Sequence, residues 1–69
     1  MLELDVWLTS FLDVRYSDLP AVQQSVFFQL LQQDDLKLFD WITGECAPPA
    51  EFLALVDEIK IIRYLGEKR

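Results

Sequence analysis

The chain has 69 residues, of which 52% are hydrophobic, and its net charge is −6. This length allows one small domain, and the apolar content indicates a folded chain rather than a disordered one. The acidic balance disfavours binding to nucleic acid or to anionic membranes, because both need clustered lysine and arginine. Histidine is absent, which excludes Ser-His-Asp and Cys-His nucleophile pairs and histidine-ligated zinc.

Apolar residues at helical spacing predict a first helix over residues 3–14. They recur at i, i+3, i+4, i+7 and i+8, the spacing of one helix face: Leu4, Trp7, Leu8, Phe11 and Leu12. Glu3 and Asp5 fall in the first turn, where negative charge complements the helix dipole. Trp7 lies centrally on the apolar stripe, so we expect its side chain to be buried.

A second helix is predicted over residues 19–32. Ser17 or Asp18 can cap it, and Pro20 is tolerated in its first turn because the missing N–H would be unpaired there. Its buried stripe consists of Val26, Phe27, Leu30 and Leu31. Phe28 lies off this stripe and is expected either to pack on another helix or to be exposed.

A short third helix is predicted over residues 35–43. Asp34 or Asp35 can cap its start, and Gly44 suits a left-handed residue at its end. The inward edge of this helix consists of Leu38, Phe39 and Ile42. Trp41 falls at the edge of the helix after an acidic turn, so a place on the surface and a place in the core are almost equally expected. Acidic groups around exposed aromatic rings are typical of protein-binding surfaces.

Residues 45–49 form a loop, because two adjacent prolines bar a helix, and a fourth helix is predicted over residues 50–65. Its main apolar face consists of Phe52, Leu55, Val56, Ile59 and Ile62. A second apolar patch lies on the opposite side, bordered by Lys60 and Arg63: Ile61, Tyr64 and Leu65. Such a patch is either covered by a further element or binds something. The predicted fold is all-α, a small bundle of four to five short helices in one domain over residues 1–69.

The sequence offers little for catalysis. Acids cluster around Asp34 and at Asp57, but a chain of this length has hardly enough material to wall a cleft. Gly44 stands alone, so no glycine-rich phosphate loop is present, and the acids do not follow the order of a calcium loop. Cys46 has no activating neighbour and no disulfide partner, which favours an inert thiol in a reducing compartment. We therefore expect a binding protein with no metal or cofactor of its own.

Charge is unevenly distributed along the chain. Residues 1–58 carry eleven acids and two bases, whereas residues 59–69 carry four bases and one acid, so the two segments have balances of −9 and +3. The helix dipole alone can account for part of this asymmetry, since it favours acids early and bases late in a helix. The body of the molecule is nevertheless acidic, which favours an acidic binding surface.

Two segments resemble the small succinate dehydrogenase assembly factors, the bacterial SdhE type and its mitochondrial relatives. One is Glu3-Leu4-Asp5 at the start of an amphipathic helix, followed by Phe11 and Tyr16. The more specific one is the run Leu30-Leu31-Gln32-Gln33-Asp34-Asp35-Leu36-Lys37-Leu38-Phe39-Asp40-Trp41. The resemblance covers roughly residues 1–63.

The resemblance implies a helical protein without catalytic groups that binds the flavoprotein subunit of succinate dehydrogenase, or of fumarate reductase. Of the two settings in which such proteins occur, the bacterial cytoplasm and the mitochondrial matrix, we expect the cytoplasm, since the sequence shows no transit peptide. There the protein promotes covalent attachment of FAD to a histidine of that subunit. The implied partner-binding residues are Glu3 first, then Asp5, Asp34, Asp35 and Trp41. The family's Arg-Gly pair and its first helix would precede residue 1, and a missing first helix would explain the second apolar patch of the fourth helix.

Two alternatives belong to other classes. One is a regulatory binder such as the antitoxin of a toxin–antitoxin pair, a label this family has also carried, because an acidic surface suits a basic target. The other is a helical subunit that forms a homodimer through the second patch of its fourth helix. We expect a monomer or a weak dimer, with no nucleic acid bound and no insertion into a membrane.

Overall fold

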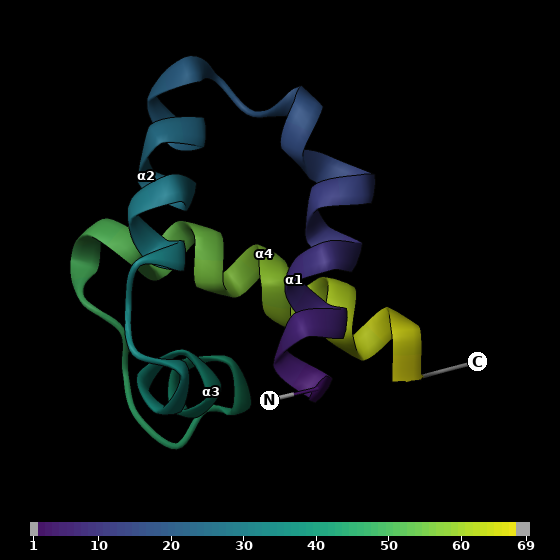
Figure 1. Ribbon diagram of the computed structural model, residues 1–69, viewed down its shortest axis with the longest axis vertical. Coiled ribbons are helices and arrows are strands. Elements are labelled where there is room, and N and C mark those ends of the chain that lie inside the picture. The colour runs from purple at the N-terminus through teal and green to yellow at the C-terminus, as the bar shows by residue number, and fades with distance from the viewer. Residues whose placement is uncertain (1, 68–69) are drawn as a thin grey trace.

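The computed structural model describes residues 2–67, and its regular structure is entirely helical over this range (Figure 1). The elements in chain order are α1 (Leu2–Arg15), a 3₁₀ turn (Tyr16–Asp18), α2 (Ala21–Leu31), α3 (Asp35–Thr43) and α4 (Ala50–Glu67). All four predicted helices are confirmed, and no boundary differs from its prediction by more than two residues. The predicted all-α bundle is thus confirmed.

The entry into α2 differs from the expected capping. Leu19 is extended, with φ −75° and ψ 140°, because the following proline disfavours the helical region for it. Pro20 itself occupies the N-cap position, and its carbonyl accepts a hydrogen bond from the amide of Gln24 at 3.0 Å. Ser17 and Asp18 form part of the 3₁₀ turn instead of capping α2.

The boundaries of α3 follow the predicted residues. Asp34 is its extended N-cap residue, and the Asp34 carbonyl accepts a hydrogen bond from the amide of Leu38 at 3.0 Å. No side-chain capping hydrogen bond accompanies it. At the other end Gly44 is left-handed with φ 89°, the conformation that the sequence predicts for this glycine.

Gly44→Ala is expected to lower the free energy of unfolding by about 1–2 kcal/mol, because an L-residue is strained at this φ. A Cβ at this position would meet nothing within 4 Å, so the cost comes from the backbone and not from crowding. Urea denaturation measures the difference. Gly44→Asn is the control, since asparagine tolerates this region better, and an alanine variant more stable than the asparagine variant would contradict the explanation.

The core lies where α1, α2 and α3 pack against α4, and α1 also contacts α3. Its buried side chains come from all four helices: Leu4, Phe11, Phe27, Leu30, Leu38, Trp41, Ile42, Phe52, Leu55, Val56 and Ile59. Three aromatic rings from α1, the 3₁₀ turn and α2 meet in this core, with centroids 5.1 Å apart for Phe11–Phe27 and 5.6 Å apart for Tyr16–Phe27. The radius of gyration, 11.2 Å, agrees with the value of roughly 11 Å for a compact chain of this length.

The structure assigns the two tryptophans differently from the sequence. Trp41 is only 7% exposed, and its ring packs 5.9 Å from that of Phe52 on α4, so of its two expected places the structure gives the core, which argues against the partner-binding place that the resemblance implied. Trp7, expected to be buried, is half-buried at the edge of the core. Phe28 is 64% exposed, which decides between the two alternatives for that residue.

Candidate partner-binding surface

Glu3 lies in the first turn of α1, and its side chain is exposed. Trp7 follows it by four residues, so both lie on the same side of the helix. The Trp7 ring stacks on that of Phe39 in α3, with centroids 5.6 Å apart and planes inclined by 22°. The guanidinium carbon of Arg63 in α4 lies 4.8 Å from the Trp7 ring, and the Nε atom of Arg63 is buried. One tryptophan therefore joins three helices directly beside Glu3.

Asp35 stands in the same relation to Phe39 as Glu3 does to Trp7. It begins α3, is exposed, and precedes Phe39 by four residues. The Glu3 carboxylate thus lies one helical turn before the Trp7 ring, and the Asp35 carboxylate lies one helical turn before the Phe39 ring. We call this region the stack face and define it by Glu3, Trp7, Asp35, Phe39 and Arg63.

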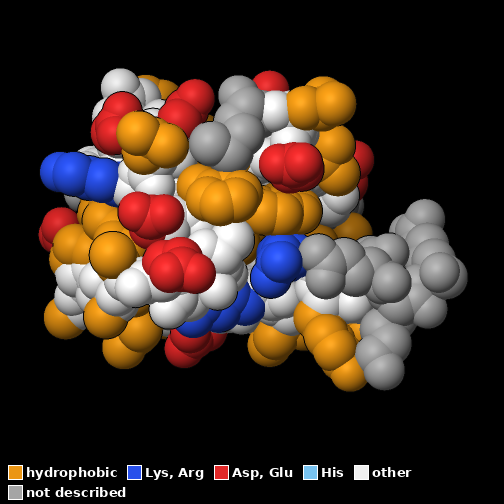
Figure 2. Space-filling view, turned by 90° about the horizontal axis from the view of Figure 1, so that it is seen from below, with side chains coloured by type: hydrophobic (Ala, Val, Ile, Leu, Met, Phe, Trp, Pro, Cys, Tyr) orange, Lys and Arg blue, Asp and Glu red, His pale blue; other side chains and the backbone are white. Residues whose placement is uncertain are grey.

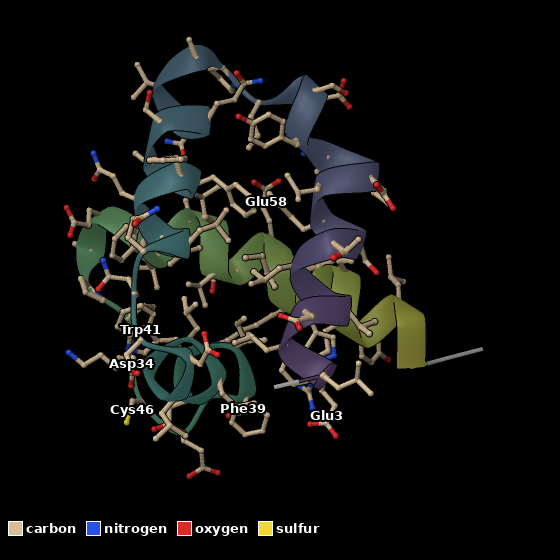
Figure 3. All side chains as sticks on the ribbon, in the orientation of Figure 1. Glu3, Asp34, Phe39, Trp41, Cys46 and Glu58 are labelled. Atoms are coloured by element: carbon tan, nitrogen blue, oxygen red, sulfur yellow. The ribbon has the colours of Figure 1, made fainter. Side chains whose placement is uncertain are left out.

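The pictures agree with this arrangement. Figure 2 views the lower end of Figure 1, and it shows hydrophobic side chains at the centre of that face, with carboxylates on either side and a basic side chain beside them. In Figure 3 Glu3 and Phe39, which come from different helices, both lie at the same lower end of the molecule. The stack face therefore combines an aromatic centre, an acidic border and one arginine, which is the composition of a protein-binding hot spot.

The other predicted site residues lie elsewhere. Asp5 is two residues from Glu3, about 200° around the helix, so it points away from Trp7. It lines a shallow hollow on the far side of α1 with Val6, Thr9 and Ser10. Asp34 lies apart from Glu3, near Trp41 and Cys46 in Figure 3. Glu3 and Asp35 thus each precede one ring of the same stack by one helical turn, whereas Asp5 lies on the other side of α1 and Trp41 is buried.

Three residues of the stack face were missed by sequence reasoning as surface residues: Trp7, Phe39 and Arg63. Trp7 and Phe39 were assigned to the core because they fall on or beside the apolar stripes of their helices. Arg63 was noted only as the border of an apolar patch. One available signal was the i, i+4 spacing of an acid and an aromatic residue, which occurs both at Glu3 and Trp7 and at Asp35 and Phe39.

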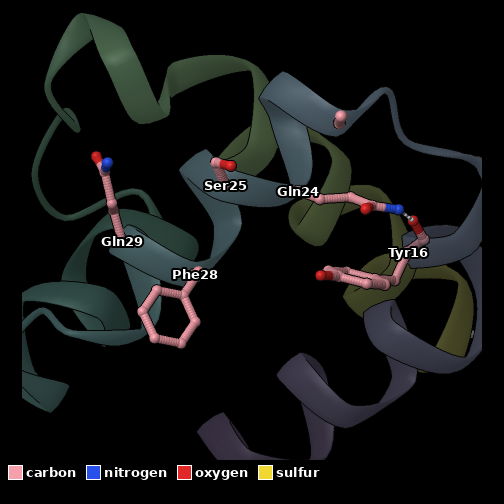
Figure 4. A pocket seen from close by; sticks show the side chains of 6 residues that line it. Tyr16, Gln24, Ser25, Phe28 and Gln29 are labelled. Atoms are coloured by element: carbon pink, nitrogen blue, oxygen red, sulfur yellow. Dashed lines mark hydrogen bonds between the residues drawn. The ribbon is translucent and has the colours of Figure 1, made fainter.

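Two further surface features lie away from the stack face. An open hollow of about 570 Å³ beside α2 is lined by uncharged side chains, those of Tyr16, Ala21, Gln24, Ser25, Phe28 and Gln29 (Figure 4). The side-chain amide of Gln24 donates a hydrogen bond across it to the Tyr16 carbonyl at 3.1 Å. Because this hollow is wide and open, it does not enclose a ligand site.

The second feature is an apolar groove of about 360 Å³ between the end of α1 and the last turns of α4. Its lining consists of Val14, Arg15, Glu58, Ile61, Ile62 and Leu65. The Arg15 guanidinium donates a hydrogen bond to the Glu58 carboxylate at 2.9 Å at its edge. Ile61, Tyr64 and Leu65 are exposed, so no described element covers the patch that the sequence predicted on this helix.

The remaining reactive groups are dispersed. The Cys46 thiol is exposed, and its backbone amide donates to the Asp40 carbonyl at 3.2 Å. Among the described residues no three acidic, cysteine or histidine side chains come together as a metal-binding group. None of the described helices is long and apolar enough to cross a membrane.

Comparison with known proteins gives consistent matches. Residues 1–63 match the family model described as the flavinator of succinate dehydrogenase. The FAD assembly factor SdhE of Coxiella burnetii is 36% identical over 61 residues, which are 87% of this chain and 74% of that protein. The protein of the same name from Photobacterium profundum is 43% identical over 61 residues, 86% of this chain and 68% of the relative. The protein of the same name from Francisella tularensis is 32% identical over 59 residues, which are 86% of this chain and 62% of that relative. No solved structure gives a significant match.

Proposed function

Because this chain belongs to the family of flavinators of succinate dehydrogenase, we propose that it is an assembly chaperone that binds the flavoprotein subunit of that enzyme. In doing so it promotes covalent attachment of FAD to the subunit. The flavoprotein subunit of fumarate reductase, which the family resemblance also implies, is a second candidate client. FAD belongs to the client in this proposal, and the chaperone contributes binding without catalytic groups or a cofactor of its own. Its setting is the cytoplasm, where a single exposed cysteine stays reduced.

The observation that carries the proposal is the stack face. Aromatic and arginine side chains dominate the binding energy of protein interfaces, and here Trp7, Phe39 and Arg63 lie beside two carboxylates. Glu3 is both the first-ranked residue from the family resemblance and a member of this face. A binding protein can accelerate the reaction by holding the client so that FAD and the acceptor side chain meet in reactive geometry.

The experiment is a comparison of covalent flavin in cells with and without this gene. Flavin that is covalently bound fluoresces with the flavoprotein subunit on a denaturing gel. We expect a strong loss of that fluorescence in cells lacking the gene and its return on complementation with this chain. Equal fluorescence in the two strains, at equal amounts of the subunit, would contradict the proposal.

The exposed patch on α4 supports self-association as a second candidate. Ile61, Tyr64 and Leu65 form an apolar surface together with Val14 of α1, and apolar patches of this kind mark interaction sites. Light scattering over a range of concentrations tests self-association. The measured molar mass of the purified chain rises with concentration if it forms a homodimer, and it stays at the monomer value if the chain binds only its client. The antitoxin alternative has no observation of its own in the structure.

A further inference from the structure

We propose that the Phe39 ring receives an arginine side chain of the flavoprotein subunit, and that the Glu3 carboxylate pairs with the same guanidinium. This inference rests on the proposed function and names the chemistry by which the stack face would recognise its client. It concerns Phe39 in particular, because the Trp7 ring already has the Arg63 guanidinium 4.8 Å from its centroid, whereas Phe39 lies with Glu3 at the lower end of the molecule in Figure 3.

The chain already uses this mode of recognition internally. Arg63 places its guanidinium 4.8 Å from the Trp7 ring, within the range of a cation–π interaction. The two rings are nearly parallel, so the Phe39 ring has one side toward Trp7 and one side turned away from it. Phe39 is only partly buried. A second guanidinium on Phe39 would extend an aromatic stack that already has one on Trp7.

Charge favours a cation at this place. The segment of residues 1–58 has a balance of −9, and Glu3 and Asp35 each lie one turn before a ring of the stack. Arginine fits better than lysine, because its planar guanidinium stacks on a ring and at the same time binds a carboxylate with two parallel hydrogen bonds. An acidic client segment would repel both carboxylates, and a purely apolar one would remove water from them without providing a partner.

The test measures binding of the purified flavoprotein subunit by calorimetry at low and high salt. Phe39→Leu keeps an apolar side chain of similar size and removes the ring, and we expect it to weaken binding by roughly three- to tenfold. Phe39→Tyr keeps the ring and should bind as the native chain does, which separates loss of the ring from loss of packing. Phe28→Leu is the matched control on another surface and should leave the affinity unchanged, since Phe28 lies on α2 and is 64% exposed.

The double variant Glu3→Gln/Phe39→Leu decides whether one client group touches both residues. If a single arginine does so, the combined loss of affinity is smaller than the product of the two single losses, and both single variants weaken the salt dependence of binding. Independent losses, or an affinity of the native chain that does not change with salt, would overturn this inference while leaving the proposed function intact. Failure of the native chain to bind the subunit at all would instead remove the proposed function.

Discussion

Glu3→Lys is expected to weaken binding of the flavoprotein subunit by roughly tenfold or more and to lower covalent flavin in cells accordingly. The substitution reverses the charge of an exposed side chain beside the Trp7–Phe39 stack and adds a second cation near Arg63. The fold should persist, because the lysine costs only the favourable interaction of an acid with the helix start, about 0.3–1 kcal/mol. Calorimetry with the purified subunit measures the affinity, and thermal melting checks the fold.

Asp5→Lys is the matched control for this result. Asp5 lies in the same helical turn, so its replacement removes a similar dipole interaction and changes the net charge by the same amount. Asp5 points to the other side of α1, where it lines a hollow with Val6 and Thr9. Binding should therefore stay close to that of the native chain. Equal losses in the two variants would show that overall charge matters and that the stack face does not.

The helices were predictable because each carries its own local signals. The apolar spacing of α1 and α4, the prolines after Cys46 and the left-handed glycine after α3 act within a few residues of the boundaries that they set. The one error at a helix boundary concerns the start of α2, where the sequence predicts Ser17 or Asp18 as the cap and Pro20 inside the first turn. Pro20 takes the N-cap position because its φ is already fixed near the observed −59°, which leaves Ser17 and Asp18 to a 3₁₀ turn.

The burial of the two tryptophans could not be predicted from local sequence signals. Spacing puts Trp7 at the centre of its apolar stripe and Trp41 at the edge of its helix, yet Trp41 is the more deeply buried of the two. The difference comes from the partners that tertiary packing provides: α4 places Phe52 against Trp41, whereas Trp7 lies at the outer junction of three helices. A short helix such as α3 turns its edge residues inward or outward according to how the long helix α4 crosses it.

The stack face itself depends on the same long-range packing. Glu3 and Asp35 are separated by 32 positions, and the packing of α1 against α3, which includes the stacking of Trp7 on Phe39, brings their helices together. The family resemblance identifies Glu3, and the acid–aromatic spacing identifies the pairs. Neither shows that the two pairs face one another, which requires the contact between α1 and α3.

Phe27→Ala is expected to leave most of the chain unfolded at room temperature. Phe27 is only 1% exposed and packs against Phe11 and Tyr16, so its removal leaves a cavity among aromatic rings. Substitutions of this kind cost about 3–5 kcal/mol. The core of a domain this small supplies a net stability of roughly 3–5 kcal/mol, so one such loss is as large as the whole of it. Helical circular dichroism as a function of urea measures the change.

Phe28→Ala, at the next position of the same helix, provides the contrast. Phe28 is 64% exposed and contributes to an open hollow beside Gln24 and Gln29, so its truncation leaves no buried cavity. Its effect on the free energy of unfolding should lie within about 0.5 kcal/mol. The two substitutions remove the same atoms from neighbouring residues of α2 and have similar effects on helix propensity. A difference between them therefore measures burial alone, and similar losses of stability in both variants would contradict the assignment of Phe27 to the core and Phe28 to the surface.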